Sequence, residues 1–452
     1  MPPSSLPDGE STPSKMPTRN QHDRMPGEGP PLIPEYHESG DPTRFGIRVP
    51  FVRPALPPAD VIARTAASII DSGRLTKGPF CDELEETIAR RLGVRHAVAV
   101  SSCTVGLMLV YRGLDLAAGS CRSRRPAGDP CAVAGLDSLA RFGVAKTAAR
   151  SEPLGEVIIP SFTFLAAPAA IVWNNLRPVF VDVEPGTTNV SAAAVRAAIT
   201  PRTVAIAACH NFGNPCDIPA LEAVASEYNL PLVVDAAHGF GASVHGRPVG
   251  AGGTVQVFSL SPTKLLVAGE GGIVATDCDC LAHFVRMGRE YGNDGSYDAL
   301  FPGVNGRMPE LSAAIALEGL KLLDGVAADR NAIARAYQEE LRDLPGIGFV
   351  ETMPGAVSSY KDFSITIDPT RFGMTRDGLR RALVAHGVET RAYYNPPCHR
   401  QTAFEHFYDR ARPLPVTELL AARSLALPIG AHVDAGVVRQ VCDIIATAKQ
   451  SA

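Results

Sequence analysis

The sequence predicts an α/β protein, with a large domain on a mostly parallel central sheet and a smaller C-terminal α+β domain. Short, nearly unbroken apolar runs recur along the first two thirds of the chain, as strands buried on both faces of a sheet require. Helical segments separate several of these runs, and repeated strand–helix units favour a parallel sheet covered by helices. A chain of 452 residues is also long enough for two domains.

The expected strands follow one another through the predicted large domain. They are HAVAV (96–100), EVIIP (156–160), RPVFVDV (177–183), TVAIAAC (203–209), LPLVVDAA (230–237), VQVFSL (255–260) and GGIVATD (271–277). Helices are expected between several of them, over 163–175, 191–200 and 218–229.

The last third of the chain has a different pattern. A helical stretch over 307–344 leads into it, and Gly325 is expected to mark a break in that stretch. One clear strand (359–368) and helices at 375–387 and 434–450 follow. We therefore assign 47–325 to the large domain and 326–452 to the small one.

Two segments do not fit this pattern. Residues 1–46 are rich in Pro, Gly, Ser and charge, so they have little to bury and are expected to form a disordered tail. Residues 117–153 are an insertion, longer than the usual connection between a helix and a strand. We interpret it as a tolerated surface insertion; a flap that covers substrate or contacts another subunit is the alternative.

Composition excludes several classes of partner. The net charge of −4 gives no reason to expect nucleic acid or an anionic membrane. No apolar run reaches the ~20 residues of a membrane span, and the N-terminus lacks the apolar core of a signal peptide, so a cytoplasmic location is expected. Only Cys278 and Cys280 lie close together, and no His cluster has zinc-ligand spacing, so no metal site is predicted.

Two ionisable residues stand at the ends of predicted strands. Lys264, in FSLSPTKLLVAGEGG, follows a buried strand, and desolvation there favours the neutral amine that Schiff-base chemistry needs; a solvated surface lysine is the alternative. Asp235, in VVDAAHGFG, lies where open α/β sheets bind ligands. A carboxylate buried there needs a cationic partner such as a protonated pyridine nitrogen, unless it merely caps the next turn.

Two further features belong with them. In AVAVSSCTVGLML a strand gives way to a helix start, whose N–H groups form an anion site with the hydroxyls of Ser102 and Thr104; a simple N-cap is the alternative. Phe164 follows another strand end and could cover a flat ring, or lie in the core. Pyridoxal 5'-phosphate (PLP) has a phosphate, an aldehyde, a flat ring and a basic ring nitrogen, so it would use all four features. We predict PLP as the cofactor.

These motifs resemble the DegT/StrS-type family of sugar aminotransferases, which have the fold type I aminotransferase architecture. The resemblance runs from about Val49 to the C-terminus, interrupted at 117–153. It is carried by SGRLTKGPFCDELEE, VSSCTVGL, VIIPSFTFLAAPAAI, RPVFVDV, VVDAAHGFGA, FSLSPTKLLVAGEGG, VNGRMPELSAAIALEGL and LALPIGAHV.

The resemblance implies catalytic roles for two residues: Lys264 as the Schiff-base lysine and general acid/base, and Asp235 as the carboxylate that keeps the pyridine nitrogen protonated. It implies cofactor contacts from Ser102, Cys103, Thr104, Phe164, Asp235, His238, Ser259, Lys264 and Asn305. Cys103 stands where the family usually has glycine, which puts the backbone geometry of that turn in question. Asn305 would reach the phosphate of the partner subunit, which implies a homodimer with shared active sites.

The implied reaction moves an amino group from L-glutamate or L-glutamine to a keto-sugar, nucleotide-linked in most of the family, or to a keto-cyclitol. Such products serve amino-sugar, polysaccharide or antibiotic biosynthesis. Substrate contacts are plausible for Arg307, Arg391, Tyr393, Tyr394 and His399, although each also suits a structural role.

Three other functions fit the sequence less well. A PLP-dependent sugar dehydratase often has His in place of the lysine, so Lys264 weighs against it. Intact Lys264, Asp235 and Asn305 weigh against a non-catalytic PLP-binding regulatory protein, although these residues by themselves indicate only cofactor binding. A Rossmann oxidoreductase is disfavoured because no G-x-G-x-x-G follows a strand.

Overall fold

The structure is a computed structural model that describes residues 48–120 and 155–450. The predicted disordered tail lies outside the described residues, and so does most of the predicted insertion. Residues 117–120 of that insertion are described, and they form the end of helix α3 (Cys103–Ser120).

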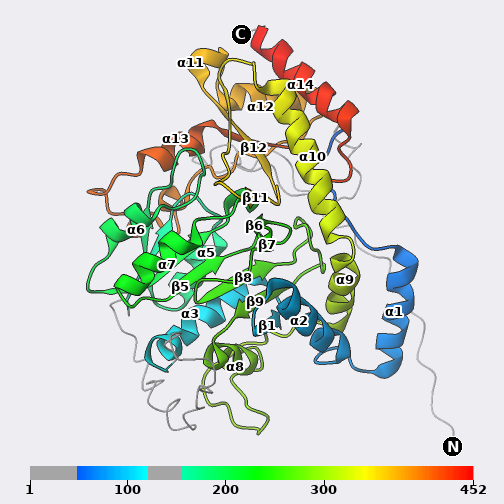
Figure 1. Ribbon diagram of the computed structural model, residues 1–452, viewed down its shortest axis with the longest axis vertical. Helices are drawn as coiled ribbons and strands as arrows, with labels where there is room; N and C mark the ends of the chain where they lie inside the picture. The colour runs from blue at the N-terminus through cyan, green and yellow to red at the C-terminus, as the bar shows by residue number, and fades with distance from the viewer. Residues whose placement is uncertain (1–47, 121–154, 451–452) are drawn as a thin grey trace, which may run out of the picture.

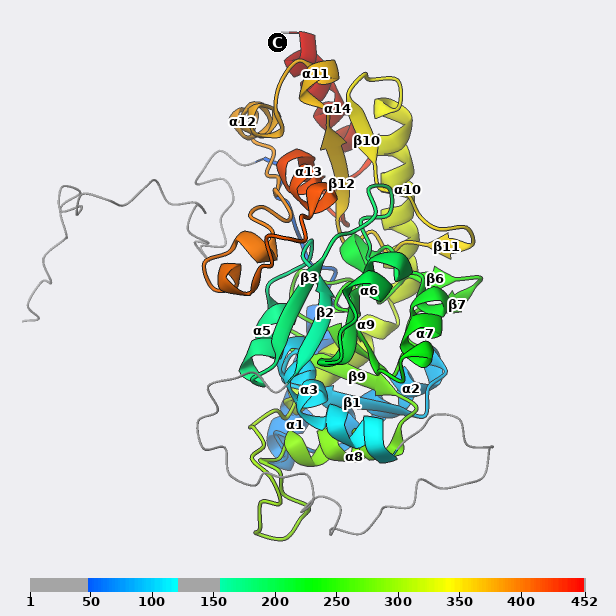
Figure 2. The same ribbon diagram turned by 90° about the vertical axis from the view of Figure 1, so that its left-hand side faces the viewer.

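Within the described residues, a seven-stranded sheet forms the centre of the larger lobe, in the order β1-β9-β8-β5-β4-β2-β3 (Figures 1 and 2). Strand β9 is antiparallel to both neighbours, and the other adjacent pairs are parallel. The mostly parallel sheet and its predicted strands are therefore confirmed. The strands are β1 (His96–Val100), β2 (Glu156–Pro160), β3 (Arg177–Val181), β4 (Thr203–Cys209), β5 (Leu232–Asp235), β8 (Val255–Ser259) and β9 (Gly272–Thr276).

Helices cover both faces of this sheet, because adjacent apolar residues of a strand point to opposite sides. Val157 of β2 packs in a cluster with Leu107 of α3, whereas the next residue, Ile158, packs with Leu221 of α7. Helices α3, α5 and α8 lie on the first face, and α2, α6, α7 and α9 on the second. The bounds of these helices and of the neighbouring α1 are α1 (Ala59–Ser72), α2 (Pro79–Leu92), α5 (Ala166–Trp173), α6 (Ala192–Ala198), α7 (Ile218–Glu227), α8 (Asp279–Gly288) and α9 (Glu310–Leu320).

The smaller lobe is built on a three-stranded antiparallel sheet, β10-β12-β13, as the α+β pattern predicts (Figure 1). Its core joins that sheet to α10, α12 and α14. The bounds are β10 (Ile347–Phe349), β12 (Phe363–Ile367), β13 (Ser424–Leu427), α10 (Leu323–Leu341), α11 (Pro369–Phe372), α12 (Arg376–Ala385), α13 (Pro415–Arg423) and α14 (Ala435–Gln450). A separate small sheet has β6 (Ser243–Val244) at its centre, paired with β11 (Ala356–Val357) on one side and β7 (Arg247–Pro248) on the other.

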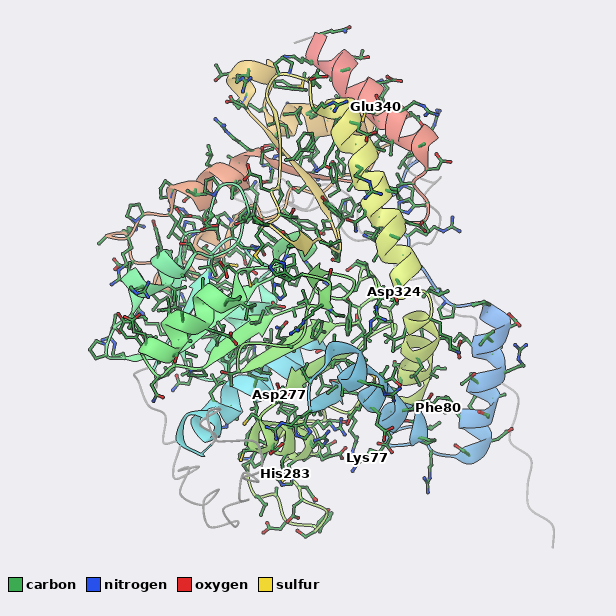
Figure 3. All side chains as sticks on the ribbon, viewed as in Figure 1. Lys77, Phe80, Asp277, His283, Asp324 and Glu340 are labelled. Atoms are coloured by element: carbon green, nitrogen blue, oxygen red, sulfur yellow. The ribbon has the colours of Figure 1, made fainter. Side chains whose placement is uncertain are left out.

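The predicted helix break at Gly325 is wrong. Helix α9 ends at Leu320 and α10 begins at Leu323, so Gly325 lies in the first turn of α10. Glycine costs only about 1 kcal/mol in a helix relative to alanine, and the burial of the neighbouring Leu323 outweighs that cost. Figure 3 shows Asp324 near the start of α10 and Glu340 near its end, in the smaller lobe. A boundary at 326 thus falls inside a continuous helix, and the division into two domains stays a prediction.

The first described residues pack with the smaller lobe and not with the large sheet. Val49 forms a bridge with Val388 and belongs to the core of the smaller lobe. The Phe51 N–H donates to Glu389 at 2.9 Å. This start of the chain therefore lies apart from the large domain to which the sequence assigns it.

One buried carboxylate fixes the start of helix α2. Glu310 accepts hydrogen bonds from the N–H groups of Gly78, Phe80 and Cys81 at 2.9–3.0 Å, and it is 1% exposed. We expect Glu310→Ala to lower the free energy of unfolding by about 3 kcal/mol, because three N–H groups lose a charged acceptor near the positive end of the helix dipole. Urea unfolding measures this loss of stability. Glu318→Ala is the control, because Glu318 lies on helix α9 together with Glu310. A loss below about 1 kcal/mol would contradict the assigned role.

Candidate active site

Lys264 lies between strands β8 and β9, on the turn after β8. Its backbone N–H donates to the Ser261 carbonyl at 3.0 Å, which closes that turn. Burial lowers the pKa of Lys264 to about 8; the nearby cation Lys361 lowers it further, and Asp362 opposes the shift. A lysine with such a pKa is partly neutral just above pH 7, as a nucleophilic amine must be.

Asp235 is the last residue of β5, at the carboxyl ends of the parallel strands. One carboxylate oxygen, Oδ1, accepts from the Ala237 N–H at 3.0 Å and lies 3.9 Å from the Cys103 thiol. Burial raises the pKa of Asp235, and the Ala237 N–H and the charge of Lys264 act in the opposite direction. Asp235 is half-buried, and a carboxylate in such a place is best stabilised by a cation beside it.

The start of α3 meets the ends of two strands. Gly272 of β9 is paired with Ser259 of β8, and a Cβ on Gly272 would lie 2.6 Å from the Cys103 nitrogen. The two backbones therefore approach as closely as only glycine permits. Ser102 accepts from the Val105 N–H at 3.1 Å through its hydroxyl, as an N-cap residue does.

The residue that departs from the family pattern is accommodated without strain. Cys103 begins helix α3 and is absent from the residues with left-handed backbone, so no glycine is needed there. Its thiol lies 3.5 Å from the Val257 carbonyl, in the core below the sheet edge. Thr104, next along the helix, is half-buried.

His238 and Phe164 have the exposure that their predicted roles require. His238 is half-buried, and burial lowers its pKa well below the usual value, with Lys264 and Lys361 adding to the shift, so its ring is neutral. Phe164 follows β2 and is 50% exposed, which rules out a core position.

Four predicted residues lie within electrostatic reach of one another. The charge on Lys264 acts on Asp235, Cys103 and His238. They come from the ends of β5 and β8 and from the start of α3, so the structure brings one amine and one carboxylate to the same edge of the sheet. Strand ends of this kind are where open α/β sheets bind ligands.

Asn305 lies on the connection between α8 and α9, with its side chain exposed. It forms a bridge with Glu290, and the next residue, Gly306, accepts from the Ser101 N–H at 2.7 Å. This exposed asparagine therefore lies beside the start of α3.

The two arginines among the predicted substrate contacts have partners elsewhere. Arg307 pairs with Glu290 at 3.1 Å and lies over the ring of Tyr291. Arg391 pairs with Glu389 at 2.5 Å and lies over the ring of Phe51. Tyr393 is half-buried, with the Lys361 amine 5.6 Å from its ring centre, and it stays a candidate.

Tyr394 and His399 stabilise the fold, which corrects their assignment as substrate contacts. Tyr394 is buried and stacks on Phe212, with ring centres 5.6 Å apart. His399 is fully buried and both of its ring nitrogens are engaged, Nδ1 with the Ser161 hydroxyl at 2.7 Å and Nε2 with Glu418 at 2.9 Å. Neither side chain is placed to meet a substrate.

The comparisons with known proteins agree with this geometry. The model of the DegT/DnrJ/EryC1/StrS aminotransferase family matches residues 59–121 and 140–446. The chain belongs to this family. The match omits 122–139, a shorter gap than the expected insertion at 117–153.

Three relatives of this aminotransferase illustrate the likeness. The erythromycin biosynthesis sensory transduction protein EryC1 of Saccharopolyspora erythraea is 40% identical over 299 residues, which is 66% of this chain and 79% of EryC1. The structure of DesI in the presence of its TDP-sugar product is 35% identical, with a TM-score of 0.76, over 89% of this chain and 93% of DesI. That of S. venezuelae DesV in complex with a ketimine intermediate is 31% identical, with a TM-score of 0.76, over 89% of this chain and 99% of DesV.

Two charged residues of this aminotransferase site escaped the sequence analysis. Lys361 and Asp362 form an ion pair with a shortest distance of 2.9 Å, and their side chains are 4% and 1% exposed. They lie just before β12, within the segment predicted as a strand. Two adjacent charges of opposite sign at the start of a predicted strand were the available signal.

Two further kinds of feature are absent from the described ranges, 48–120 and 155–450. These ranges contain no group of three or more His, Cys, Asp or Glu residues placed to hold a metal ion. They also contain no helix with the length and apolar character to cross a membrane.

A buried histidine makes the stability of this aminotransferase depend on pH. Burial lowers the pKa of His210 to about 4, and its Nδ1 accepts from the Cys216 N–H at 3.0 Å. Between about pH 6.5 and pH 4 the unfolded chain binds this proton and the folded chain does not, so stability falls as pH falls.

We expect His210 alone to remove about 2.5 kcal/mol of stability between pH 7.5 and pH 4.5. Urea unfolding at both values checks this, by comparing the slope of the wild type with that of His210→Gln, which should be shallower. The exposed His406, replaced by Gln, is the control. Equal slopes for the wild type and His210→Gln would refute the prediction.

Proposed function

We propose that this aminotransferase uses PLP to move an amino group from L-glutamate or L-glutamine to a keto-sugar. The observation that carries the proposal is the placement of Lys264, with its lowered pKa, and Asp235 at one edge of the sheet. The described residues fit PLP: the amine suits an aldehyde, the buried carboxylate suits a protonated ring nitrogen, and the start of α3 suits a phosphate.

Each residue of the site receives a role. Lys264 holds the cofactor covalently and afterwards serves as acid and base, with its Nζ taking the proton from the α-carbon of the amino donor. Asp235 keeps a proton on the ring nitrogen. When bound, PLP supplies an electron sink for the carbanion formed by that proton transfer.

The remaining groups hold the cofactor. The start of α3 faces the phosphate with the backbone of Cys103 and the hydroxyls of Ser102 and Thr104, together with Ser259 at the end of β8. Phe164 covers one face of the ring, and His238 contacts the ring hydroxyl. Asn305, exposed beside the start of α3, reaches the phosphate of a second copy, so the working form is a homodimer with shared active sites.

The acceptor we propose is a keto-sugar linked to a nucleoside diphosphate. DesI, whose structure was determined in the presence of its TDP-sugar product, is 35% identical to this chain. A keto-cyclitol is the alternative acceptor. The product would serve amino-sugar, polysaccharide or antibiotic biosynthesis.

A half-reaction tests the donor and the reaction type together. The purified protein, saturated with PLP, is incubated with L-glutamate or L-glutamine without acceptor. We expect one equivalent of the corresponding keto acid per protomer, and further release when a nucleotide-linked keto-sugar is added. Release of no keto acid from either donor would reject the proposal, and would favour a dehydratase or a non-catalytic binding protein. Release that resumes only with a keto-cyclitol would correct the acceptor.

A further inference from the structure

A buried polar segment of the smaller lobe faces the candidate active site. It consists of residues 358–362, which lead into β12. Four of its five residues are almost fully enclosed: Ser358 is 3% exposed, Ser359 0%, Lys361 4% and Asp362 2%, counted over the whole residue. Polar residues are seldom buried to this extent unless a local interaction requires it.

Hydrogen bonds fix this segment against the loops that carry the site. The Ser359 hydroxyl donates to the His238 carbonyl at 2.7 Å, and its N–H donates to the Gly213 carbonyl at 3.0 Å. Gly241 lies between Ser359 and Leu265: a Cβ there would be 3.6 Å from Ser359 Cβ and 2.9 Å from Leu265 Cδ2. The segment is therefore packed beside the immediate neighbour of Lys264.

The two charges of the segment pair with each other inside the protein. Lys361 Nζ lies 2.9 and 3.1 Å from the carboxylate oxygens of Asp362. Arg330 holds the backbone by donating to the carbonyls of Tyr360 and Lys361 at 2.9 Å. Charges enclosed in this way are poorly screened, so they act on other groups over several ångströms.

Stability alone is a weak reason for such a pair. The cost of desolvating two charges often exceeds their mutual attraction, and a buried pair can frequently be replaced by apolar side chains without loss of stability. A pair held beside an ionisable group of the site has a different effect, because each charge shifts the ionisation of that group in its own direction.

We infer that Lys361 and Asp362 are positioning residues that together set the protonation state of Lys264. Lys361 favours the neutral amine and Asp362 favours the ammonium ion. The inference rests on the proposed function, in which Lys264 must be neutral to bind the cofactor and must then exchange a proton.

The other ionisable groups around Lys264 have smaller effects on its pKa than Lys361 and Asp362 do. After burial, Lys361 is the largest influence that lowers the pKa of Lys264, and Asp362 is the largest that raises it. Cys103 and Asp235 raise it by smaller amounts. His238 is neutral, because burial lowers its own pKa. Lys361 and Asp362 are thus the groups to change.

The test measures the pKa of Lys264 in the cofactor-free full-length protein. Competitive acetylation with isotopically labelled acetic anhydride across pH 6–11, followed by peptide mass spectrometry, gives the pKa without using catalysis. We expect Lys361→Met to raise the pKa of Lys264 by about one unit, and Asp362→Asn to lower it by about one unit.

Opposite signs distinguish this inference from a merely structural role. A loosened structure would let water reach Lys264, which raises its pKa in both variants. A rise in both variants, or no shift in either, therefore overturns the inference. Lys361→Arg keeps the charge and should leave the pKa within about 0.3 units of the wild type.

Matched controls come from the exposed pair Lys321–Glu318 at 2.7 Å. Lys321→Met and Glu318→Gln should leave the pKa of Lys264 unchanged. Circular dichroism checks that each variant folds. If Lys361→Met does not fold, Lys361→Gln, which keeps a donor for Asp362, replaces it. The same rise in the pKa of Lys264 is then expected. Because the measurement is made without cofactor, it tests the pKa shifts alone. Its result does not depend on whether the holoenzyme transfers amino groups.

Discussion

Lys264→Ala is expected to reduce amino transfer by about 10⁴-fold, the largest effect of any single change in this protein. In the proposed mechanism, alanine removes both the covalent attachment of the cofactor and the amine that moves the proton of the donor. The burial that lowers the pKa of Lys264 to about 8 prepares one amine for both tasks, and Lys361 lies too deep in its own ion pair to replace it. Formation of the aminated product, measured by mass spectrometry, checks the prediction.

The matched control for this change is Lys321→Ala. The side chain of Lys321 is 68% exposed, and Lys321 is distant from Lys264 in the sequence. It should keep full activity. Turnover by Lys264→Ala within tenfold of the wild type would remove this lysine from the mechanism.

Asp235→Asn is expected to reduce turnover by about 10²- to 10³-fold. An amide cannot stabilise a positive charge on the ring nitrogen as a carboxylate does, so the developing carbanion loses its electron sink. Asp294→Asn, on an exposed loop, is the control and should keep its activity. Steady-state kinetics with a saturating donor measures the loss in kcat.

The same variant has an opposite effect on stability. Burial raises the pKa of Asp235, so the folded chain binds this proton more tightly than the unfolded chain does. Above that pKa the ionised carboxylate therefore destabilises the fold, and a neutral amide removes the cost. We expect cofactor-free Asp235→Asn to have a higher Tm at pH 7.5 than the cofactor-free wild type. A lower Tm together with lost activity would mean that the change acts by unfolding the protein.

Local pattern predicted much of this fold. The strand runs predicted over 230–237 and 255–260 contain many apolar residues, and the structure ends the corresponding strands β5 and β8 slightly earlier, at Asp235 and Ser259. The edge where parallel strands end is a consequence of topology, so polar residues at these ends could be grouped before any coordinates were known. The same argument brought Lys264 and the start of α3 to one place.

Long-range packing accounts for the assignments that failed. For His399 the sequence left both a substrate contact and a structural role open. Its partner Ser161 is 238 residues away in the chain, and only the folded protein shows that the two hydrogen-bond. The same limit applies to Lys361 and Asp362, whose adjacent charges look solvated until the smaller lobe is placed against the loop of His238.

The helix break failed for a local reason. Gly325 is a weak helix former, and such a residue can end a helix. The cost of glycine in a helix is only about 1 kcal/mol, however, and the burial of Leu323, which fixes where α10 starts, outweighs it. Core contacts outweigh propensity at this position.

The most direct test of the central claim is chemical trapping of the cofactor. The purified protein is saturated with PLP, reduced with sodium borohydride, digested and mapped by mass spectrometry. The account predicts a phosphopyridoxyl group on the peptide that contains Lys264, at close to one per protomer, and none on the peptide that contains Lys361. A modification at Lys361 or at any other lysine, or no modification at all, would contradict it.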